Sequence, residues 1–354
     1  MLFLSRLEIE QWKALRDEIT AKKIEPGRFD GHVRSNLLPA FRYFIGAFLV
    51  DKGWGELGKK WFIAGATSEE GGYFSNAFMT SFLDRHAGRL IMPDVAFADP
   101  LPFVHFSTVP AIKKARERFI TYCGRSMPRL THPVRVMDIG CGDGALIVKL
   151  LQELQSVSGK IDDIGEILLI DPSPAMLRLA EETVSRAFPA SAIKTANCRM
   201  EEFSDKINTK YDIALSSLAY HHMPLEKKRL HLERLKPWID HLVLFELNAN
   251  NDTPEQHSPE LALSVYQSYG RIIDMVFAHD ASVEIVLACV DRFLMTEAIS
   301  FLTQPRGIRT DYHMLDSQWT ELFESTLSRD FTCLCDSSCY ADEQMSLFIM
   351  HYGR

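Results

Sequence analysis

The sequence has little of what marks nucleic-acid-binding chains. Over 354 residues, 47 aspartates and glutamates outnumber 39 lysines and arginines, which gives a formal net charge of −8. A chain whose main partner is a nucleic acid more often carries a basic excess or a basic stripe. The lysine- and arginine-rich clusters at 22–23, 59–60 and 227–229 are short and lie among acids. We therefore expect no nucleic-acid partner.

Long apolar runs and a cysteine framework are also missing. No stretch approaches the ~20 apolar residues that span a bilayer. The apolar start at residues 1–4 is followed by Arg6 and Glu8, which makes it too short for a secretory signal. Seven cysteines scattered over the chain do not suggest disulfides. We expect a cytoplasmic protein with no membrane partner.

The pattern of apolar residues divides the chain into segments. Apolar residues recur at helical spacing over 7–20 and 37–52, and residues 1–115 are predicted to form a helical module that serves as a lid or a dimerisation surface. Two long apolar helical stretches, at 261–278 and 283–301, predict a helical insertion at about 250–310. An apolar surface on the first module would suit a homodimer, although apolar helices also serve as lid or core.

From residue 134, short apolar runs alternate with helical segments. Strands are predicted at 134–139, 166–170, 192–196, 212–216 and 241–246, with helices at 144–155, 175–187 and 225–235. This alternation predicts a doubly wound, mostly parallel sheet. Two runs at 331–340 and 345–352 predict an antiparallel C-terminal hairpin, which makes seven strands in a second domain over 116–354. Cys333, Cys335 and Cys339 share parity in one of these runs, so we expect them on one buried face.

A glycine-rich turn follows the first strand and opens a helix. Glycines at 140, 142 and 144 allow a sharp turn and a close approach to a ligand. A dinucleotide-binding loop would have the spacing Gly-x-Gly-x-x-Gly, whereas the glycines here follow a Gly-x-Gly-x-Gly spacing. A tight strand-to-helix turn that binds no ligand is the structural alternative. The second strand ends in Asp171, where an acid can accept hydrogen bonds from both hydroxyls of a ribose.

With these motifs, residues 134–246 resemble the core of class I S-adenosylmethionine-dependent methyltransferases. The resemblance implies that S-adenosylmethionine is the cofactor, that the glycine loop faces its methionine part and that Asp171 holds its ribose. Family members often carry an acid after the third strand for the adenine amine. This chain has Arg199 and Met200 there, and Met200 is a candidate to pack on adenine. The predicted cofactor-binding residues are Asp138, Gly140, Cys141, Gly142, Gly144, Asp171, Pro172, Met176, Arg199, Met200, Ser216 and Ser217.

The resemblance also implies that the segment after the fourth strand lines the methyl-transfer site. His221 and His222 lie there, and we predict that one of them contacts the acceptor. A pair of histidines that caps the next helix is the structural alternative. Tyr220 and Tyr312 are further candidates to line the pocket.

A divalent metal is a second prediction for this edge. His222, Glu246 and His257 would form a His/carboxylate set suited to iron or a similar ion, which could acidify a carbon of a keto or dicarbonyl acid. Ordinary polarity of a substrate pocket is the alternative.

The sequence thus predicts a methyltransferase that acts on O, N or C of a small organic acceptor. A carrier-bound acyl group or a protein side chain as the acceptor is the runner-up. A non-catalytic protein that retained the cofactor site is the alternative from a different class.

Overall fold

The structure is a computed structural model that describes residues 2–70, 73–93, 99–327 and 329–354. It divides into two compact units. The helical unit comprises Met1–Ala96, Ala249–Tyr312 and Asp342–Met345, and the sheet unit comprises Phe97–Asn248, His313–Ala341 and Ser346–Arg354. The division predicted at residue 115 therefore falls within a helix of the sheet unit, and the predicted insertion belongs with the N-terminal helices.

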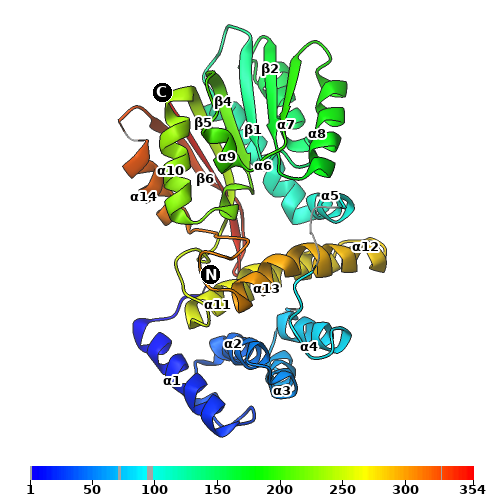
Figure 1. Ribbon diagram of the computed structural model, residues 1–354, viewed down its shortest axis with the longest axis vertical. Coiled ribbons are helices and arrows are strands. Elements are labelled where there is room, and N and C mark those ends of the chain that lie inside the picture. The colour runs from blue at the N-terminus through cyan, green and yellow to red at the C-terminus, as the bar shows by residue number, and fades with distance from the viewer. Residues whose placement is uncertain (1, 71–72, 94–98, 328) are drawn as a thin grey trace. The chain divides into compact units, whose positions relative to one another are not determined.

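The sheet unit contains one seven-stranded sheet in the order β3-β2-β1-β4-β5-β7-β6 (Figure 1). Strands β1 to β5 pair in parallel, whereas β7 pairs antiparallel with both β5 and β6. The predicted fold class, with its antiparallel C-terminal hairpin, is confirmed. The strands are β1 (Val134–Ile139), β2 (Ile164–Ile170), β3 (Ala192–Ala196), β4 (Tyr211–Ser217), β5 (Ile239–Asn248), β6 (Thr332–Ala341) and β7 (Ser346–Gly353).

Helices cover both faces of this sheet, because its central strands are apolar on both sides. On one face α6, α7 and α8 pack side by side, and Phe119 of α6 contacts Phe245 of β5 with ring centroids 5.1 Å apart. On the other face α9, α10 and α14 pack over a continuous apolar core. The α-helices of the unit are α5 (Leu101–Thr108), α6 (Pro110–Ser126), α7 (Ala145–Gln152), α8 (Pro174–Ala187), α9 (Met200–Ser204), α10 (Leu225–Leu235) and α14 (Asp316–Thr326), with short helical turns η3 (Glu153–Val157), η4 (Tyr220–His222) and η5 (Lys236–Trp238).

The cysteines of β6 do not share one face. Cys339 is buried, whereas Cys333 is exposed. The strand has irregularities between Cys333 and Cys335 and between Ser338 and Tyr340, and each one shifts the alternation of side chains. The parity argument that put all three cysteines in the core is therefore wrong for Cys333.

The helical unit joins the N-terminal helices to the segment after β5. Trp12 packs against Phe41 and Phe44 with ring centroids 5.1 and 5.9 Å away, and Tyr266 contacts Tyr43 at 5.4 Å. These rings lie in the core of the unit, where aromatic side chains each bury a large apolar area. Its helices are α1 (Arg6–Lys22), α2 (Leu38–Asp51), α3 (Gly55–Ala66), α4 (Ser75–Arg85), α11 (Pro259–Phe277), α12 (Val283–Ala288) and α13 (Met295–Thr303), with turns η1 (Asp30–His32), η2 (Ser35–Leu37) and η6 (Cys289–Leu294).

The helix predicted at 283–301 is one continuous run with a wider turn, η6, between α12 and α13. In the part of the chain that the structure describes, no helix combines the length and the apolar character that crossing a membrane requires.

Candidate functional site

The glycine loop between β1 and α7 takes the conformation for which glycine is required. Gly140, Gly142 and Gly144 have φ angles of 70°, 55° and 74°, a region that other residues enter only with strain. A Cβ at Gly140 would overlap that of Ala219, and one at Gly144 would lie 3.0 Å from Cα of Ala180. The loop therefore fits tightly between α8 and the segment after β4.

Asp171, at the end of β2, is tied to this loop. Its Oδ2 accepts a hydrogen bond from N–H of Gly142 at 3.1 Å, and its Oδ1 accepts one from N–H of Ser173 at 2.8 Å. Burial raises the pKa of Asp171, and the two backbone donors oppose this shift. Asn197 donates from Nδ2 to the carbonyl oxygen of Asp171 at 3.0 Å, which fixes the β2 end against the β3 end. This is the place where an acid holds a ribose in doubly wound folds.

Three carboxylates gather around the loop. Asp138 is 3% exposed, and burial together with Asp171 and Asp143 raises the pKa of Asp138 to about 8. A cluster of buried carboxylates that repel one another favours a cation among them. S-adenosylmethionine carries two cationic groups, a sulfonium and an ammonium. The electrostatics of the loop fits this cofactor.

The remaining predicted cofactor residues lie at the same carboxyl edge of the sheet unit. Met176 is buried at the start of α8, and its Cε lies 3.8 Å from where a Cβ of Gly142 would be. Met200 is buried at the start of α9, whereas Arg199 is exposed. The hydroxyl oxygens of Ser216 and Ser217 are buried and lack hydrogen-bond partners within the described residues. Orphaned hydroxyls beside the glycine loop are what a bound ligand would satisfy.

The segment after β4 is organised by one buried carboxylate. Glu246, near the end of β5, accepts hydrogen bonds at Oε1 from the backbone N–H groups of Ala219, Tyr220 and His221, at 3.1, 3.0 and 3.3 Å. Its Oε2 lies 2.9 Å from Nδ1 of His221. Leu218, with a φ of 51°, starts the turn that brings these N–H groups together. Glu246 thus holds both the backbone and the ring of His221.

The protonation states follow from the charges around Glu246. Burial alone would raise the pKa of Glu246, but His221, His313 and Lys228 lower it to about 2. Burial, with smaller effects of His313 and His222, lowers the pKa of His221 against the opposing effect of Glu246. Lys228 is completely buried and supplies a positive charge to Glu246, with its Nζ 5.2 Å from the ring centre of Trp319. We therefore assign an ionised Glu246 and a neutral His221 that donates from Nδ1, which puts the basic lone pair on Nε2.

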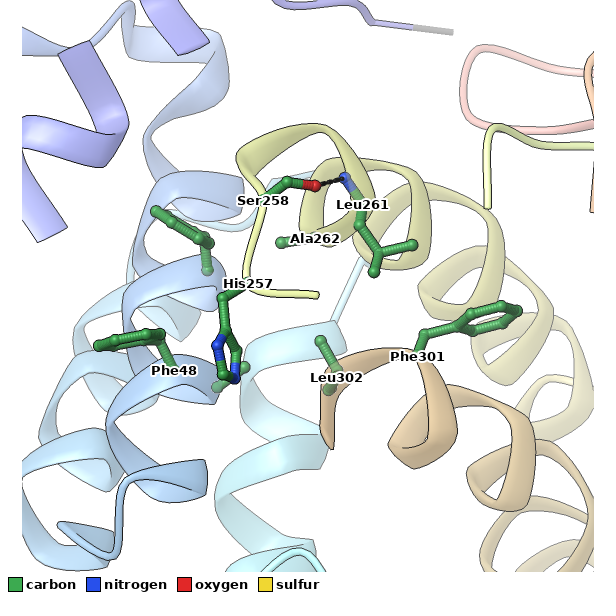
Figure 2. Close-up of a pocket in the computed structure, with 9 residues that line it drawn as sticks. Phe48, His257, Ser258, Leu261, Ala262, Phe301 and Leu302 are labelled. Carbon is green, nitrogen blue, oxygen red and sulfur yellow. Dashed lines mark hydrogen bonds between the residues drawn. The ribbon is translucent and has the colours of Figure 1, made fainter. Parts of the chain in front are cut away.

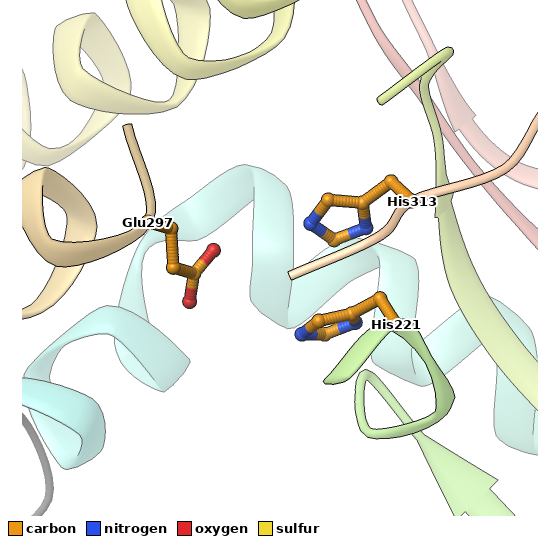
Figure 3. Close-up of side chains that lie close together, drawn as sticks. All are labelled: His221, Glu297 and His313. Carbon is orange, nitrogen blue, oxygen red and sulfur yellow. The ribbon is translucent and has the colours of Figure 1, made fainter. Parts of the chain in front are cut away.

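The ring of His221 is also held by its neighbours. Figure 3 shows it facing the ring of His313, and the two ring centroids are 4.1 Å apart with a 31° angle between the planes. The ring of His222 is 4.3 Å away. His222 is only partly buried, and its charge acts on Asp171. Both predicted histidines therefore lie at the edge where the carboxyl ends of the parallel strands meet.

Tyr220, by contrast, packs into the core of the sheet unit. Its side chain is completely buried, its hydroxyl pairs with Nδ1 of His231 at 2.9 Å, and its ring contacts Trp319 at 5.8 Å. These contacts give Tyr220 a structural role in place of the predicted contact with the acceptor.

Two predicted residues belong to the helical unit. Tyr312 is the last residue of its second segment and is buried. His257 pairs through Nε2 with Asp51 at 2.8 Å and contacts the ring of Phe48 at 4.9 Å. It lines a small apolar pocket of the unit (Figure 2), formed by Phe44, Ala47, Phe48, His257, Ser258, Leu261, Ala262, Phe301 and Leu302. Within the described chain, Glu246 and His257 thus have protein partners, and metal binding stays a prediction.

Sequence reasoning missed two residues that precede β1. Phe103 of α5 lies against the glycine loop, with ring atoms 3.1 Å from where a Cβ of Gly142 would be, and the guanidinium of Arg116 lies 5.8 Å from the centre of that ring. No motif marks either residue. The only signal was an aromatic and a basic residue in the helices directly before the first strand.

Comparisons with known proteins agree with this geometry. Residues 137–241 match the model of a family described as "Methyltransferase domain". None of the curated proteins compared with the chain matches it.

Solved structures of similar fold are distant in sequence. SCL7 of Oryza sativa is 14% identical, with 97% of this chain and 99% of SCL7 covered and a TM-score of 0.58. Magnesium protoporphyrin IX methyltransferase of Synechocystis PCC 6803 with bound SAH is 12% identical, with coverage of 71% and 93% and a TM-score of 0.42. The plantazolicin methyltransferase BpumL in complex with SAH is 14% identical, with coverage of 78% and 99% and a TM-score of 0.43.

The family match covers β1 to the start of β5, the same stretch that carries the glycine loop, Asp171 and the histidine segment. Residues 137–241 therefore match a methyltransferase domain, and the sheet that contains them has a Rossmann-like fold.

Proposed function

We propose that the chain transfers a methyl group from S-adenosylmethionine to a small organic acceptor whose nucleophilic atom begins protonated, with His221 as the base. The observation that carries the proposal is the contact between Glu246 and Nδ1 of His221 at 2.9 Å. A carboxylate in this position fixes the tautomer of the imidazole and stabilises the imidazolium that forms. A methyltransferase needs such a base only when the acceptor must lose a proton, as with a phenol or an acidic carbon.

When bound, S-adenosylmethionine supplies an electrophilic methyl group on a sulfonium. The residues of the chain would supply alignment, exclusion of water and removal of one proton. The proton of the acceptor would pass to Nε2 of His221 while the acceptor atom bonds the methyl carbon and the bond between that carbon and sulfur breaks. The electron pair of the broken bond would stay on sulfur, so that neutral S-adenosylhomocysteine leaves. Ionised Glu246 stabilises the positive charge that then develops on the ring. The three backbone N–H groups at Oε1 and the charge of Lys228 favour the ionised form of Glu246 while His221 is still neutral.

The acidic character of the chain supports a small acceptor. With a net charge of −8, the chain as a whole would repel a polyanionic partner. A carrier-bound acyl group or a protein side chain remains the runner-up acceptor. The metal that the sequence predicts at His222, Glu246 and His257 stays a prediction.

The test is a panel of phenols, amines, keto acids and dicarbonyl acids, assayed for formation of S-adenosylhomocysteine with and without ferrous iron or manganese. We expect turnover without added metal on an acceptor with an acidic O–H or C–H. His221→Gln should lower kcat on that acceptor by about 100-fold or more, since general base catalysis contributes about that much. Cofactor affinity should stay within about twofold.

A matched variant separates the base from the residue that orients it. Glu246→Gln keeps an oxygen for the three backbone N–H groups but presents an N–H to Nδ1 of His221, which favours the wrong tautomer. We expect kcat to fall as in His221→Gln while the cofactor still binds. Full activity of either variant would show that His221 is not the base.

A further inference from the structure

Arg116 is a partly buried cation that the proposed chemistry does not use. It lies on α6, which packs beside α7, the helix that the glycine loop opens. Its Nε is buried and has no hydrogen-bond partner among the described residues. An arginine that loses contact with water without gaining a full set of partners costs free energy, so its retention calls for an explanation.

The side chain of Arg116 is directed to the glycine loop. Its guanidinium lies over the ring of Phe103, and that ring lies against Gly142. Burial lowers the pKa of Arg116, and the carboxylate of Asp143 in the loop opposes this shift. Asp143 itself accepts a hydrogen bond from N–H of Ala145 at 3.1 Å, so its carboxylate is committed to the start of α7.

The sheet order indicates which part of the cofactor meets this loop. The strands run β3-β2-β1-β4, and Asp171 at the end of β2 is the assigned ribose contact. The nucleoside then occupies the β2 and β3 ends. The resemblance to the methyltransferases implies that the amino-acid part then meets the glycine loop, near the ends of β1 and β4.

That amino-acid part brings a carboxylate to a place that already holds Asp138, Asp143 and Asp171. Its ammonium group is favoured there, but its carboxylate would be repelled unless a cation faced it. Among the described residues beside the loop, Arg116 provides such a cation. Its planar guanidinium is suited to a carboxylate, and stacking on Phe103 keeps the plane in one orientation.

We propose that Arg116, stacked on Phe103, binds the carboxylate of the methionine part of the cofactor and so selects ligands that carry the intact amino acid. This inference rests on the proposed use of S-adenosylmethionine. It assigns no step of methyl transfer to Arg116.

The test compares two ligands that differ only in the amino-acid part. Calorimetric titration of the full chain with S-adenosylhomocysteine and with methylthioadenosine reports the contribution of that part. Arg116→Gln should weaken the binding of S-adenosylhomocysteine by about 10- to 100-fold, as expected for the loss of a hydrogen bond to a charged group. It should change the affinity for methylthioadenosine by less than about twofold. Lys114→Gln, at an exposed position of the same helix, should change neither affinity.

The outcomes separate this inference from the assignment of the cofactor. If the native chain binds both ligands and Arg116→Gln weakens neither, or weakens both equally, Arg116 does not bind the carboxylate. If the native chain binds neither ligand, the cofactor assignment itself fails. Arg116→Lys retains the charge without the planar fork and should fall between the native chain and Arg116→Gln. Circular dichroism of each variant verifies that a loss of affinity is not a loss of fold.

Discussion

At the scale of single residues, the cofactor loop depends on glycine for two separate reasons. One is the left-handed backbone, and the other is the lack of room for a Cβ. Gly140 combines both, since its φ is 70° and a Cβ would overlap that of Ala219. Gly159 has a similar φ of 61°, but nothing lies within 4 Å of where its Cβ would be. The pair therefore separates strain from steric exclusion.

We predict that Gly140→Ala abolishes detectable binding of S-adenosylmethionine, because the loop must shift away from Ala219. Gly159→Ala should lower the free energy of unfolding by about 1 kcal/mol because of backbone strain. It should leave the affinity for S-adenosylmethionine unchanged. Calorimetry and thermal unfolding of both variants measure the two effects. Equal losses of affinity in the two variants would contradict the steric account.

Asp138 leads to a prediction about protons. Its pKa is raised to about 8, so the side chain is mostly protonated at pH 7 in the absence of the cofactor. A bound cation favours the carboxylate and lowers this pKa, so that binding of S-adenosylmethionine at pH 7 releases close to one proton. Titrations in buffers of different ionisation enthalpy measure the release. Asp138→Asn should abolish it, and a native chain that takes up or exchanges no protons would show that Asp138 is already ionised.

At the scale of elements, the end of the sheet where β5 begins carries a buried chain of neutral groups. Nε2 of His351 on β7 lies 3.2 Å from Nδ1 of His241 on β5, and its Nδ1 lies 2.7 Å from the hydroxyl of Ser126 on α6. Burial, with a smaller effect of His241, lowers the pKa of His351 to about 3. Burial likewise lowers the pKa of His241, against the opposite effect of Asp240 and Asp212.

Protonation of this pair should therefore unfold the sheet unit in acid. Well above pH 6.5, His351 is unprotonated in both the folded and the unfolded state. It then contributes nothing to the pH dependence of the free energy of unfolding. As the pH falls from 6.5 toward 3, the unfolded state binds a proton that the folded state excludes, and the free energy of unfolding falls by about 1.4 kcal/mol per pH unit. Urea unfolding between pH 7 and 5 measures the slope, and His351→Gln should reduce it. An unchanged slope in that variant would contradict the assignment.

Most elements of the sheet unit could be predicted from the sequence, because parallel strands buried on both faces give short apolar runs that helices interrupt. The runs over Val134–Ile139 and Ala192–Ala196 matched their strands in full. Helices α3, α4 and α5 were missed, since they are short and lie in a region where apolar residues are frequent on every face. The irregular register of β6 was missed because nothing in the local pattern marks a bulge.

The site divides along the same line. The glycine loop and Asp171 follow from local spacing, so the sequence could place them after β1 and at the end of β2; their contacts with the cofactor stay a prediction. The role of Glu246 and the placement of Arg116 depend on elements that are distant in sequence, and spacing along the chain carries no information on them. Glu246 was predicted as a metal ligand, but in the structure its oxygens accept hydrogen bonds from the segment after β4.

At the scale of the whole molecule, the helical unit is built from three separate segments. Its N-terminal helices pack with α11, so residues more than 200 positions apart share one core; Tyr43 and Tyr266 are an example. The sequence predicted both helical parts but not that they form one unit, because only long-range contacts join them. Whether the apolar helices also make a homodimer stays a prediction.

Cofactor binding should protect the two units unequally. We predict that S-adenosylhomocysteine slows amide hydrogen exchange most strongly over residues 138–145, 171–176 and 216–222 of the sheet unit. At 100 times its Kd, the ligand adds about 2.7 kcal/mol to the stability of the unit that binds it. Exchange in α1 and α3 should change little. Protection concentrated in those helices would place the cofactor outside the glycine loop.

The most direct test of the central claim is a calorimetric titration of the full chain with S-adenosylmethionine, repeated with Asp171→Ala. We predict saturable binding of one cofactor per chain without added metal, and a sharp loss of affinity in the variant. Absence of binding to the native chain, or equal affinity of Asp171→Ala, would contradict the assignment of this site.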